Sequence, residues 1–247
     1  MYKYLFLLLC CTQTAVGQKL PPIQLDRPDQ TECPFIVPKK NVQVEVGFTY
    51  QQTDRHSSSI FMPSMLSKYG VNEKLELRLI TELEQSKVKG ATDFGLNPVK
   101  IGFKTKLVVE KGWIPMISFI GHLSLPTIAS DKNKADYYAP TFRFTLQHTL
   151  SEKVSLGYNL GAEWDGFTPE PTFIYTLTSG FSLTEKLGSY IELYGFLPQK
   201  DKPDHRFDGG FTYLVNNDVM LDISGGAGFS KSSPDYYASL GFSFRFR

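Results

Sequence analysis

The sequence predicts an all-β protein, a 12-stranded antiparallel transmembrane β-barrel preceded by an extended N-terminal segment. Two observations predict this fold. From residue 41 onward, apolar and polar residues alternate with a period of two, in segments of about ten residues, the length that a tilted strand needs to cross a bilayer. The connections between these segments are alternately short and long, as they are at the two ends of an outer-membrane barrel.

The composition excludes several other classes of protein. The chain has 247 residues, of which 41% are hydrophobic and 14% aromatic, and its formal net charge is +1. Beyond the leader, no run of about 18 apolar residues occurs, which excludes a helical membrane protein. The frequent aromatic and β-branched residues exclude a disordered chain. The nearly neutral charge leaves no basic surplus to neutralise phosphates, so nucleic acid is not an expected partner.

Residues 1–17, MYKYLFLLLCCTQTAVG, are expected to be a cleaved signal peptide. Lys3 provides the positive start, an apolar core follows, and Ala15 and Gly17 are the small residues that precede a cleavage site. Such a leader predicts export and, together with the barrel, placement in the outer membrane of a Gram-negative bacterium.

The cysteines predict no disulfide framework. Cys10 and Cys11 would be removed with the signal peptide, so Cys33 stands alone in the mature chain. A reactive thiol at Cys33 would need a basic or metal partner, and none is evident nearby. A small residue in a loop is the favoured interpretation, and neither a metal nor any other cofactor is expected.

Residues 18–40 form a separate, proline-rich N-terminal region. Proline fixes φ and lacks an amide hydrogen, so the five prolines here exclude a regular helix or a central strand. Four charged side chains in its centre, Asp26, Arg27, Asp29 and Glu32, are the candidates for contacts with the barrel. Two interpretations stay open: an extended segment that plugs the lumen and pairs with inward charges, or a periplasmic tether.

Residues 41–247 are expected to form the barrel. The last segment alternates most cleanly, with Phe242, Phe244 and Phe246 on one face and serines on the other, and it is similar to the terminal signal that outer-membrane barrels present to their assembly machinery. The second segment, 58–68, contains Pro63 and has an ambiguous face. The predicted strands begin near residues 41, 58, 74, 97, 114, 140, 153, 171, 187, 206, 218 and 236.

The connections repeat with the period of a hairpin. Short turns of similar sequence, such as TLSEKVSL (149–156) and SLTEKLGS (182–189), alternate with longer polar loops such as those at 126–139 and 198–206. In an outer-membrane barrel the short turns are periplasmic and the long loops extracellular. The long loops are therefore expected to form the external mouth.

The ionisable face of the strands is expected to point inward. Twelve strands enclose a lumen too wide for apolar side chains to fill, so polar side chains belong inside and apolar ones face lipid. The predicted lumen-lining side chains are Glu45, Glu76, Arg78, Glu82, Glu84, Lys100, Lys104, Lys106, Arg143, Glu163, Glu192, Asp208, Asp222 and Arg245.

Two neighbouring segments predict a ladder of opposite charges across the third and fourth strands. Glutamates 76, 82 and 84 would face lysines 100, 104 and 106. Such facing pairs stabilise strand register by roughly 0.2–1 kcal/mol each. They would also set a transverse field that favours polar or zwitterionic solutes. A salt-bridge network that merely fills a narrow barrel stays an equal alternative.

Several stretches resemble outer-membrane transporter-like proteins named for the meta-pathway of phenol degradation. The resemblance begins with DRPDQTECP (26–34), where members usually have serine in place of Cys33, and spans nearly the whole mature chain. It implies an outer-membrane β-barrel assigned to transport, without a catalytic signature. The other matching stretches are YGVNEKLELRL (69–79), GLNPVKIGFKTKL (95–107), LSLPTIAS (123–130) and ELYGFLPQ (192–199).

The favoured functional hypothesis is passive or gated passage of an unidentified small solute, with outer-membrane lipid and the assembly machinery as partners. One alternative is an outer-membrane lipid hydrolase that uses His122 and Ser124, which lie two residues apart and so point to the same face of a strand. No Asn or Gln can be placed beside them as an orienting residue. A non-conducting structural or adhesive barrel is the other alternative.

Overall fold

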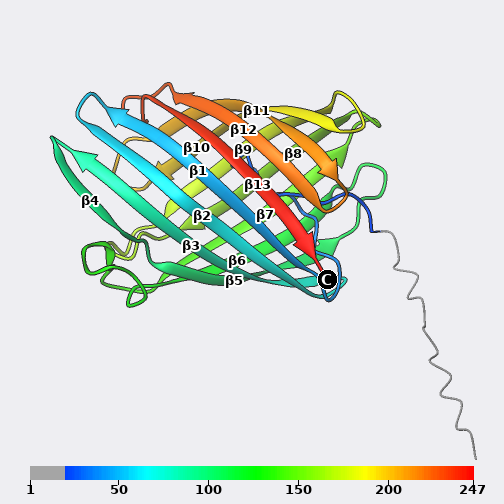
Figure 1. The fold of residues 1–247 in the computed structure, drawn as a ribbon, viewed down its shortest axis with the longest axis horizontal. Helices are drawn as coiled ribbons and strands as arrows, with labels where there is room; N and C mark the ends of the chain where they lie inside the picture. Colours follow the sequence, from blue (N-terminus) through cyan, green and yellow to red (C-terminus); the bar gives the residue numbers. More distant parts are fainter. Residues whose placement is uncertain (1–19) are drawn as a thin grey trace, which may run out of the picture.

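The computed structural model describes residues 20–247, so the expected signal peptide at 1–17 lies outside the described residues. Its strands form one antiparallel sheet that curls round until it closes on itself (Figure 1). Twelve strands make the closed ring, and one further strand, β4, lies outside it. The predicted fold class is therefore confirmed.

The twelve strands of the ring begin within two residues of the predicted starts. The elements are β1 (Val42–Asp54), β2 (Ser57–Asn72), β3 (Leu75–Val88), β4 (Ala91–Leu96), β5 (Val99–Val108), β6 (Met116–Leu125), the 3₁₀-helix η1 (Asp131–Asn133), β7 (Ala139–Thr149), β8 (Val154–Glu163), β9 (Thr172–Ser182), β10 (Leu187–Pro198), β11 (Asp204–Asn216), β12 (Val219–Gly228) and β13 (Tyr236–Phe246).

Strand β4 is absent from the predicted set. β3 pairs with β5 over Leu75–Ile80 and with β4 over Leu83–Val88, so one long strand is matched by two shorter ones in succession. The break between β4 and β5 falls at residues 97–98, where Pro98 has no amide hydrogen to donate to a ladder. β4 therefore extends the wall beyond β6 at one end of the barrel.

Apolar side chains cover the outside of the ring, and charged side chains lie inside it. Leu77 on β3 and Phe242 on β13 are 50% and 40% exposed, whereas Glu45 on β1 and Lys104 on β5 are fully buried. This distribution is the reverse of a soluble barrel and is that of a transmembrane barrel. No helix within residues 20–247 has the length and apolar character needed to span a bilayer.

The ambiguous face of β2 has a local cause. Its register with β1 and with β3 shifts between Phe61 and Ser64, around Pro63. An extra residue in a strand exchanges the inward and outward faces of everything that follows. Phe61 and Ser64 consequently both line an interior cavity, and Lys68, further along β2, is buried.

One end of the barrel, called here the turn side, carries connections 73–74, 109–115, 150–153, 183–186 and 217–218, all but one of which have two to four residues. The opposite end, the loop side, carries connections 126–138, 164–171, 199–203 and 229–235. Two loop-side connections, 55–56 and 89–90, are shorter than the long loops expected at this end, because β2 and β3 are themselves long, with 16 and 14 residues.

Candidate functional site

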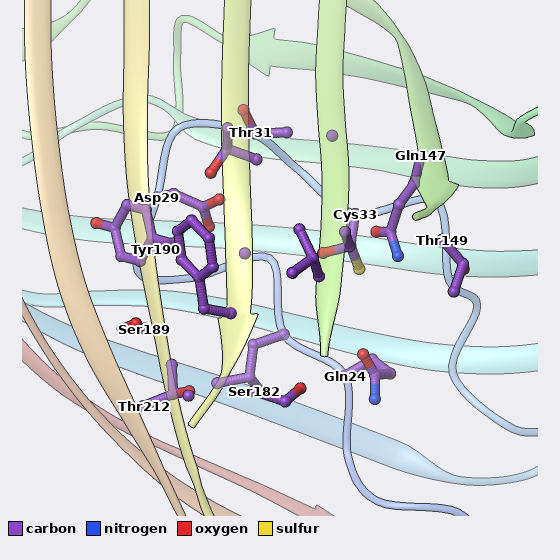
Figure 2. Close-up of a pocket in the computed structure, with 18 of the residues that line it drawn as sticks. Gln24, Asp29, Thr31, Cys33, Gln147, Thr149, Ser182, Ser189, Tyr190 and Thr212 are labelled. Atoms are coloured by element: carbon purple, nitrogen blue, oxygen red, sulfur yellow. The ribbon is translucent and has the colours of Figure 1, made fainter. Parts of the chain in front are cut away.

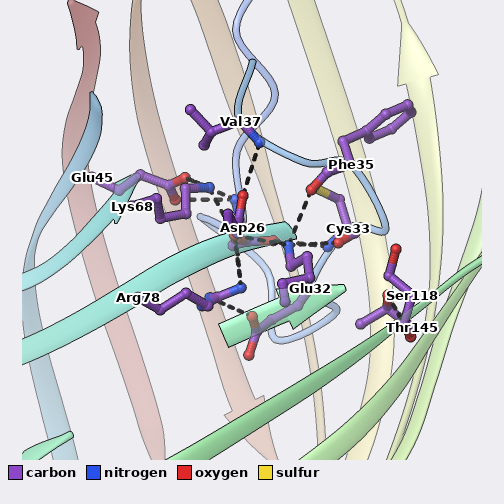
Figure 3. Close-up of polar contacts among 12 residues, drawn as sticks. Asp26, Glu32, Cys33, Phe35, Val37, Glu45, Lys68, Arg78, Ser118 and Thr145 are labelled. Carbon is purple, nitrogen blue, oxygen red and sulfur yellow. Dashed lines mark hydrogen bonds and ion pairs between the residues drawn. The ribbon is translucent and has the colours of Figure 1, made fainter. Parts of the chain in front are cut away.

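The N-terminal segment, described from residue 20 to residue 41, lies against the charged interior of the barrel (Figure 3). Ile23 is fully buried, and Val37 and Asp26 are only 4% and 6% exposed. The segment forms no strand or helix, as its prolines predict. Its backbone must therefore find hydrogen-bond partners on the barrel wall.

Both ends of the segment are bonded to the turn side of the barrel. At its start, the Ile23 amide donates to the Asn217 carbonyl oxygen at 2.9 Å, and Arg245 Nη2 donates to the Pro21 carbonyl oxygen at 2.8 Å. At its end, the Lys40 amide donates to the Gly70 carbonyl oxygen at 2.7 Å. The segment therefore enters and leaves through the same end, and its centre reaches up into the lumen.

Asp26 is the centre of a buried ion cluster. One carboxylate oxygen lies 2.7 Å from Lys104 Nζ, and the other lies 3.0 Å from Lys68 Nζ and 3.2 Å from Arg78 Nη1 (Figure 3). Lys68 also lies 2.5 Å from Glu45. Three strands of the wall, β2, β3 and β5, thus each direct a cation at one carboxylate of the segment.

The balance of charge decides the ionisation of Asp26. Burial alone would raise its pKa, but the charges of Lys104, Lys68 and Arg78 outweigh it and hold the pKa well below its usual value. A buried ion cluster adds little to the stability of a folded protein compared with apolar side chains of the same volume. Removing one partner is nevertheless strongly destabilising, because it leaves a buried charge uncompensated. Asp26 therefore fixes the position of the segment strongly.

Carboxylates of the wall accept hydrogen bonds from backbone amides of the segment. The amides of Asp26 and Arg27 donate to Glu45, the amide of Val37 donates to Glu76 at 2.8 Å, and that of Gln30 donates to Glu192 at 2.7 Å. Charged acceptors make such bonds stronger than those between neutral groups. These side chains replace the neighbouring strand that the segment lacks.

Carbonyl oxygens of the segment are satisfied by donors on the opposite wall. Ser118 Oγ donates to the Pro34 carbonyl oxygen at 2.6 Å, Asn159 Nδ2 to that of Glu32 at 3.0 Å, and Arg143 Nη1 to that of Gln30 at 3.0 Å. The donors lie on β6, β8 and β7. The segment consequently bridges the lumen between two walls.

Arg27 projects across the lumen to β12 and β13. Its guanidinium lies 3.0 Å from both Asp222 Oδ1 and Ser239 Oγ. Gly47 and Gly241 face each other across β1 and β13, and a Cβ at Gly241 would lie 2.8 Å from Arg27 Nε. The missing side chains of these two glycines make the space that Arg27 occupies.

The segment divides the interior into cavities. The turn-side cavity has a volume of about 380 Å³ and is lined by hydroxyl-bearing side chains of β7–β11 and by the segment (Figure 2). A smaller cavity of about 230 Å³ is lined by the segment and by residues of β1, β2, β3, β10, β11 and β13. Arg27 and Pro28 line both cavities. A single thickness of chain therefore separates them.

A third cavity, the loop-side cavity, has a volume of about 470 Å³. Residues from β3, β4, β5 and the 164–167 connection line it, and it shares Glu82 with the smaller cavity. No residue of the N-terminal segment lines it. It lies on the far side of the segment from the turn-side cavity.

Acidic side chains meet where the segment passes β10 and β11. Asp29 faces the turn-side cavity, and burial together with the negative charge of Asp208 raises the pKa of Asp29 to about 8. Glu192 accepts hydrogen bonds from Gln30 and Thr31, and Asp208 accepts one from Tyr237 at 2.5 Å. Asp29 is therefore protonated at neutral pH, which removes one charge from a crowded acidic site.

Cys33 takes part in the ion cluster around Asp26 through its backbone. Its amide donates to Asp26 Oδ1 at 3.1 Å, and its carbonyl oxygen accepts from Lys104 Nζ at 2.8 Å. Burial raises the pKa of the thiol, so the side chain is not an activated nucleophile.

The side chains predicted to line the lumen occupy three kinds of place. Lys106 lies at the turn-side mouth with Lys39 and Lys40, and Asp208 bonds Tyr237. A second group lines the loop-side cavity: Glu82, Glu84, Lys100 and Glu163. The remaining members contact the N-terminal segment: Glu45, Glu76, Arg78, Lys104, Arg143, Glu192, Asp222 and Arg245.

The expected ladder of glutamates and lysines is wrong except at one rung. Glu76 is directly opposite Lys104, 4.0 Å away, but Lys104 is closer to Asp26. β3 leaves β5 after Ile80, so Glu82 and Glu84 lie beside β4. Asn97 Nδ2 donates to both of them at 3.0 Å.

Sequence reasoning missed Lys68 and several neutral side chains that hold the segment. Lys68 was hidden by the bulge of β2, which reverses the alternation before it. The Thr31 hydroxyl, which donates to Glu192, lies 2.6 Å from the Thr176 hydroxyl. Asn159 both accepts from the Glu32 amide and donates to the Glu32 carbonyl oxygen. A search for neutral polar residues on the charged face would have found Asn159 and Thr176.

The proposed catalytic pair does not form a dyad. His122 and Ser124 are both 8% exposed on β6, and no hydrogen bond joins them in the part of the chain that the structure describes. Gly102 and Lys100 are their cross-strand neighbours on β5. Nothing in this geometry activates Ser124.

Channels and a porin are among the solved structures that share this fold. The COG4313 outer membrane channel from Pseudomonas putida F1 has a TM-score of 0.69 at 12% identity, covering 89% of this chain and 99% of that one. The NanC porin has a TM-score of 0.56 at 9% identity, covering 82% and 98%. The CymD monoaromatic hydrocarbon channel has a TM-score of 0.50 at 10% identity, covering 85% and 89%. These likenesses support the fold.

No curated protein matches the sequence. The family model described as "Putative MetA-pathway of phenol degradation" matches residues 25–246, from the N-terminal segment to the last residue of β13. This match confirms the resemblance seen in the sequence. The chain belongs to that phenol-degradation MetA-pathway family.

Proposed function

We propose that the protein is an outer-membrane channel for small solutes and that its N-terminal segment is a resident plug. The observation that carries this proposal is the position of Arg27 and Pro28, which line cavities on both sides of the segment. Displacing one short stretch of chain would join these cavities into a path between the two ends of the barrel.

The interior supports passage of a solute. Serine, threonine and charged side chains line the cavities, and such groups can replace part of a solute's hydration shell. Passage needs no cofactor and no covalent step. The channels and porins that share the fold support the same conclusion, although the monoaromatic hydrocarbons in the name of CymD belong to that protein.

The cellular setting follows from the same proposal. The apolar outer face would contact outer-membrane lipid of a Gram-negative bacterium, and the turn side would be periplasmic. Residues 1–17 would direct export, and the alternating aromatic residues of β13 would engage the assembly machinery.

Planar-bilayer recording tests the channel and the plug separately. The mature protein is compared with a variant that lacks residues 18–40, and insertion of both is checked by protease resistance of the barrel. We expect small or rare conductance steps from the mature protein and larger, frequent steps from the variant. Absence of conductance from both inserted forms would contradict the channel. Equal conductance would contradict the plug alone.

A further inference from the structure

The loop-side cavity has features that the charged cluster around Asp26 does not explain. It lies between β3, β4, the beginning of β5, the end of β6 and the 164–167 connection, with a volume of about 470 Å³. This volume falls in the range of sites for small organic molecules. Because no residue of the N-terminal segment lines it, a solute would meet it before reaching the plug.

Polar groups inside this cavity lack protein partners. Ser124 is 8% exposed and lines the cavity, and its hydroxyl makes no hydrogen bond within residues 20–247. Within the same described range, the side chains of Glu163 and Lys100 make no hydrogen bond or ion pair. The Ser124 hydroxyl and the two charged groups are therefore available to a molecule that enters the cavity.

Carboxylates outnumber cations in the cavity. Glu82 and Glu84 are held side by side by the shared amide of Asn97, at 3.0 Å from each. Glu163 adds a third carboxylate, and Lys100 is the cation that opposes them. The sign of the local potential therefore favours a positively charged guest.

The remaining acids of the lining are already engaged. Lys132 donates to Asp93, and Asp165 accepts hydrogen bonds from the amides of Phe167 and Thr168 at 2.7 and 2.8 Å. These two carboxylates therefore shape the rim. Glu82 and Glu84 accept hydrogen bonds from Asn97, and Glu84 accepts another from Ser59 Oγ at 2.8 Å, but these neutral donors leave their negative charge uncompensated. The side chain of Glu163 has no hydrogen-bond or ion-pair partner within residues 20–247.

One wall of the cavity is apolar. Trp164 and Phe167 line it, together with Ile80, Pro98 and Ala139. Hydrogen bonding of Trp164 Nε1 to the Pro169 carbonyl oxygen, at 3.1 Å, fixes the indole. An aromatic wall next to carboxylates suits a cation that carries a flat apolar body.

We propose that the loop-side cavity binds small organic amines, with the ammonium group at Glu163 and the Glu82–Glu84 pair and the apolar body against Trp164. This proposal rests on the proposed channel function, because it takes the bound amine to be a solute in transit through the barrel. It assigns that solute a chemical class, a protonated amine on an aromatic or compact apolar skeleton.

The two tryptophans allow a binding test that does not depend on conduction. Trp113 is 97% exposed at the turn side, whereas Trp164 lines the cavity. In the full mature chain, Trp113→Phe leaves Trp164 as the single tryptophan. Fluorescence of the folded protein in detergent is titrated with 2-phenylethylamine, 2-phenylethanol and phenylacetate, which share a phenyl ring and differ in charge.

We expect a saturable change with the amine, at least tenfold tighter than with the alcohol or the acid, since a charged hydrogen bond is strong when partly desolvated. Glu163→Gln in the same background should weaken amine binding roughly tenfold. Glu185→Gln, an isosteric change at an exposed turn-side residue, should leave it unchanged.

Three results would overturn the proposal: equal affinity for amine and alcohol, tighter binding of phenylacetate, or unchanged amine binding after Glu163→Gln in protein that folds normally. Bilayer recordings of the same proteins separate this failure from failure of the channel. Conductance without amine selectivity in the titration would leave the channel intact and remove only the amine site.

Discussion

Asp26 and Lys104 lie 2.7 Å apart in the buried interior of the barrel, although 78 residues separate them in the chain. The contact joins the N-terminal segment to β5, and the same carboxylate also meets Lys68 and Arg78. The position of the segment therefore depends on one side chain more than on any other. This relationship makes the proposed plug open to direct tests.

Asp26→Asn should loosen the segment without changing its size. Removing one partner of a buried ion cluster destabilises the arrangement by about 3–5 kcal/mol, because the other charges lose their compensation. Cys33 is the single cysteine beyond the expected leader, so labelling by a bulky maleimide reports exposure of the segment. We expect faster labelling in Asp26→Asn than in wild type.

Asp201→Asn, at an exposed loop-side position, is the matched control and should label at the wild-type rate. Equal labelling of Asp26→Asn and wild type would show that the ion cluster does not hold the segment.

A disulfide between the segment and β9 should lock the plug. The Thr31 and Thr176 hydroxyls are 2.6 Å apart, so cysteines at both positions have their Cβ atoms close enough to bridge. In a Cys33→Ser background, we expect the oxidised Thr31→Cys/Thr176→Cys protein not to conduct and to recover conductance on reduction. Conductance that ignores the redox state would argue against displacement of this stretch. The Cys33→Ser parent should not respond to reductant.

Alkaline pH should favour opening. The pKa of Asp29 is raised to about 8 by burial and by Asp208, so the seated segment binds a proton that the displaced segment would release. Stability from this group is fully present below the ordinary carboxyl pKa and is lost as the pH rises through about 8. We expect more frequent conductance at pH 9 than at pH 6.

Asp29→Asn has no proton to lose and should flatten this dependence. A pH response that is identical in Asp29→Asn and wild type would assign it to another group.

A charge on the outer face should destabilise the barrel in lipid. Leu77 on β3 is 50% exposed and has lipid as its expected surroundings, so Leu77→Arg should destabilise the barrel, by an amount between about 1 kcal/mol, as near an interface, and about 2–4 kcal/mol, as at the midplane. Urea unfolding from phosphatidylcholine vesicles measures the loss. Leu150→Arg, in a turn-side connection, should have little effect. Equal stability of Leu77→Arg and wild type would contradict the assigned outer face.

Alternation along the chain was sufficient to predict the ring. β1 begins at Val42 against a predicted start near residue 41, and β13 begins at Tyr236 as expected. Alternation with a period of two is a property of each strand by itself, so it can be recognised without knowing which strands pair with one another. β4 escaped prediction because it is 6 residues long and continues into β5 through residues 97–98.

The pairing of the charges could not be predicted in the same way. Facing glutamates and lysines were expected to neutralise each other, but the N-terminal segment brings Asp26 between them and supplies a closer partner for Lys104. The register of β3 against two successive strands then moves Glu82 away from β5. Both facts depend on contacts between distant parts of the chain, which composition and period do not encode.

The segment is bonded to the barrel rim at both ends, through Ile23 and Asn217 on one side and Lys40 and Gly70 on the other. A displaced centre would therefore stay at a high effective concentration next to its own seat. Closure becomes an intramolecular step whose rate is independent of how much protein is present. Unlike a soluble blocker, such a barrier cannot be diluted away, and each barrel restores its own seal.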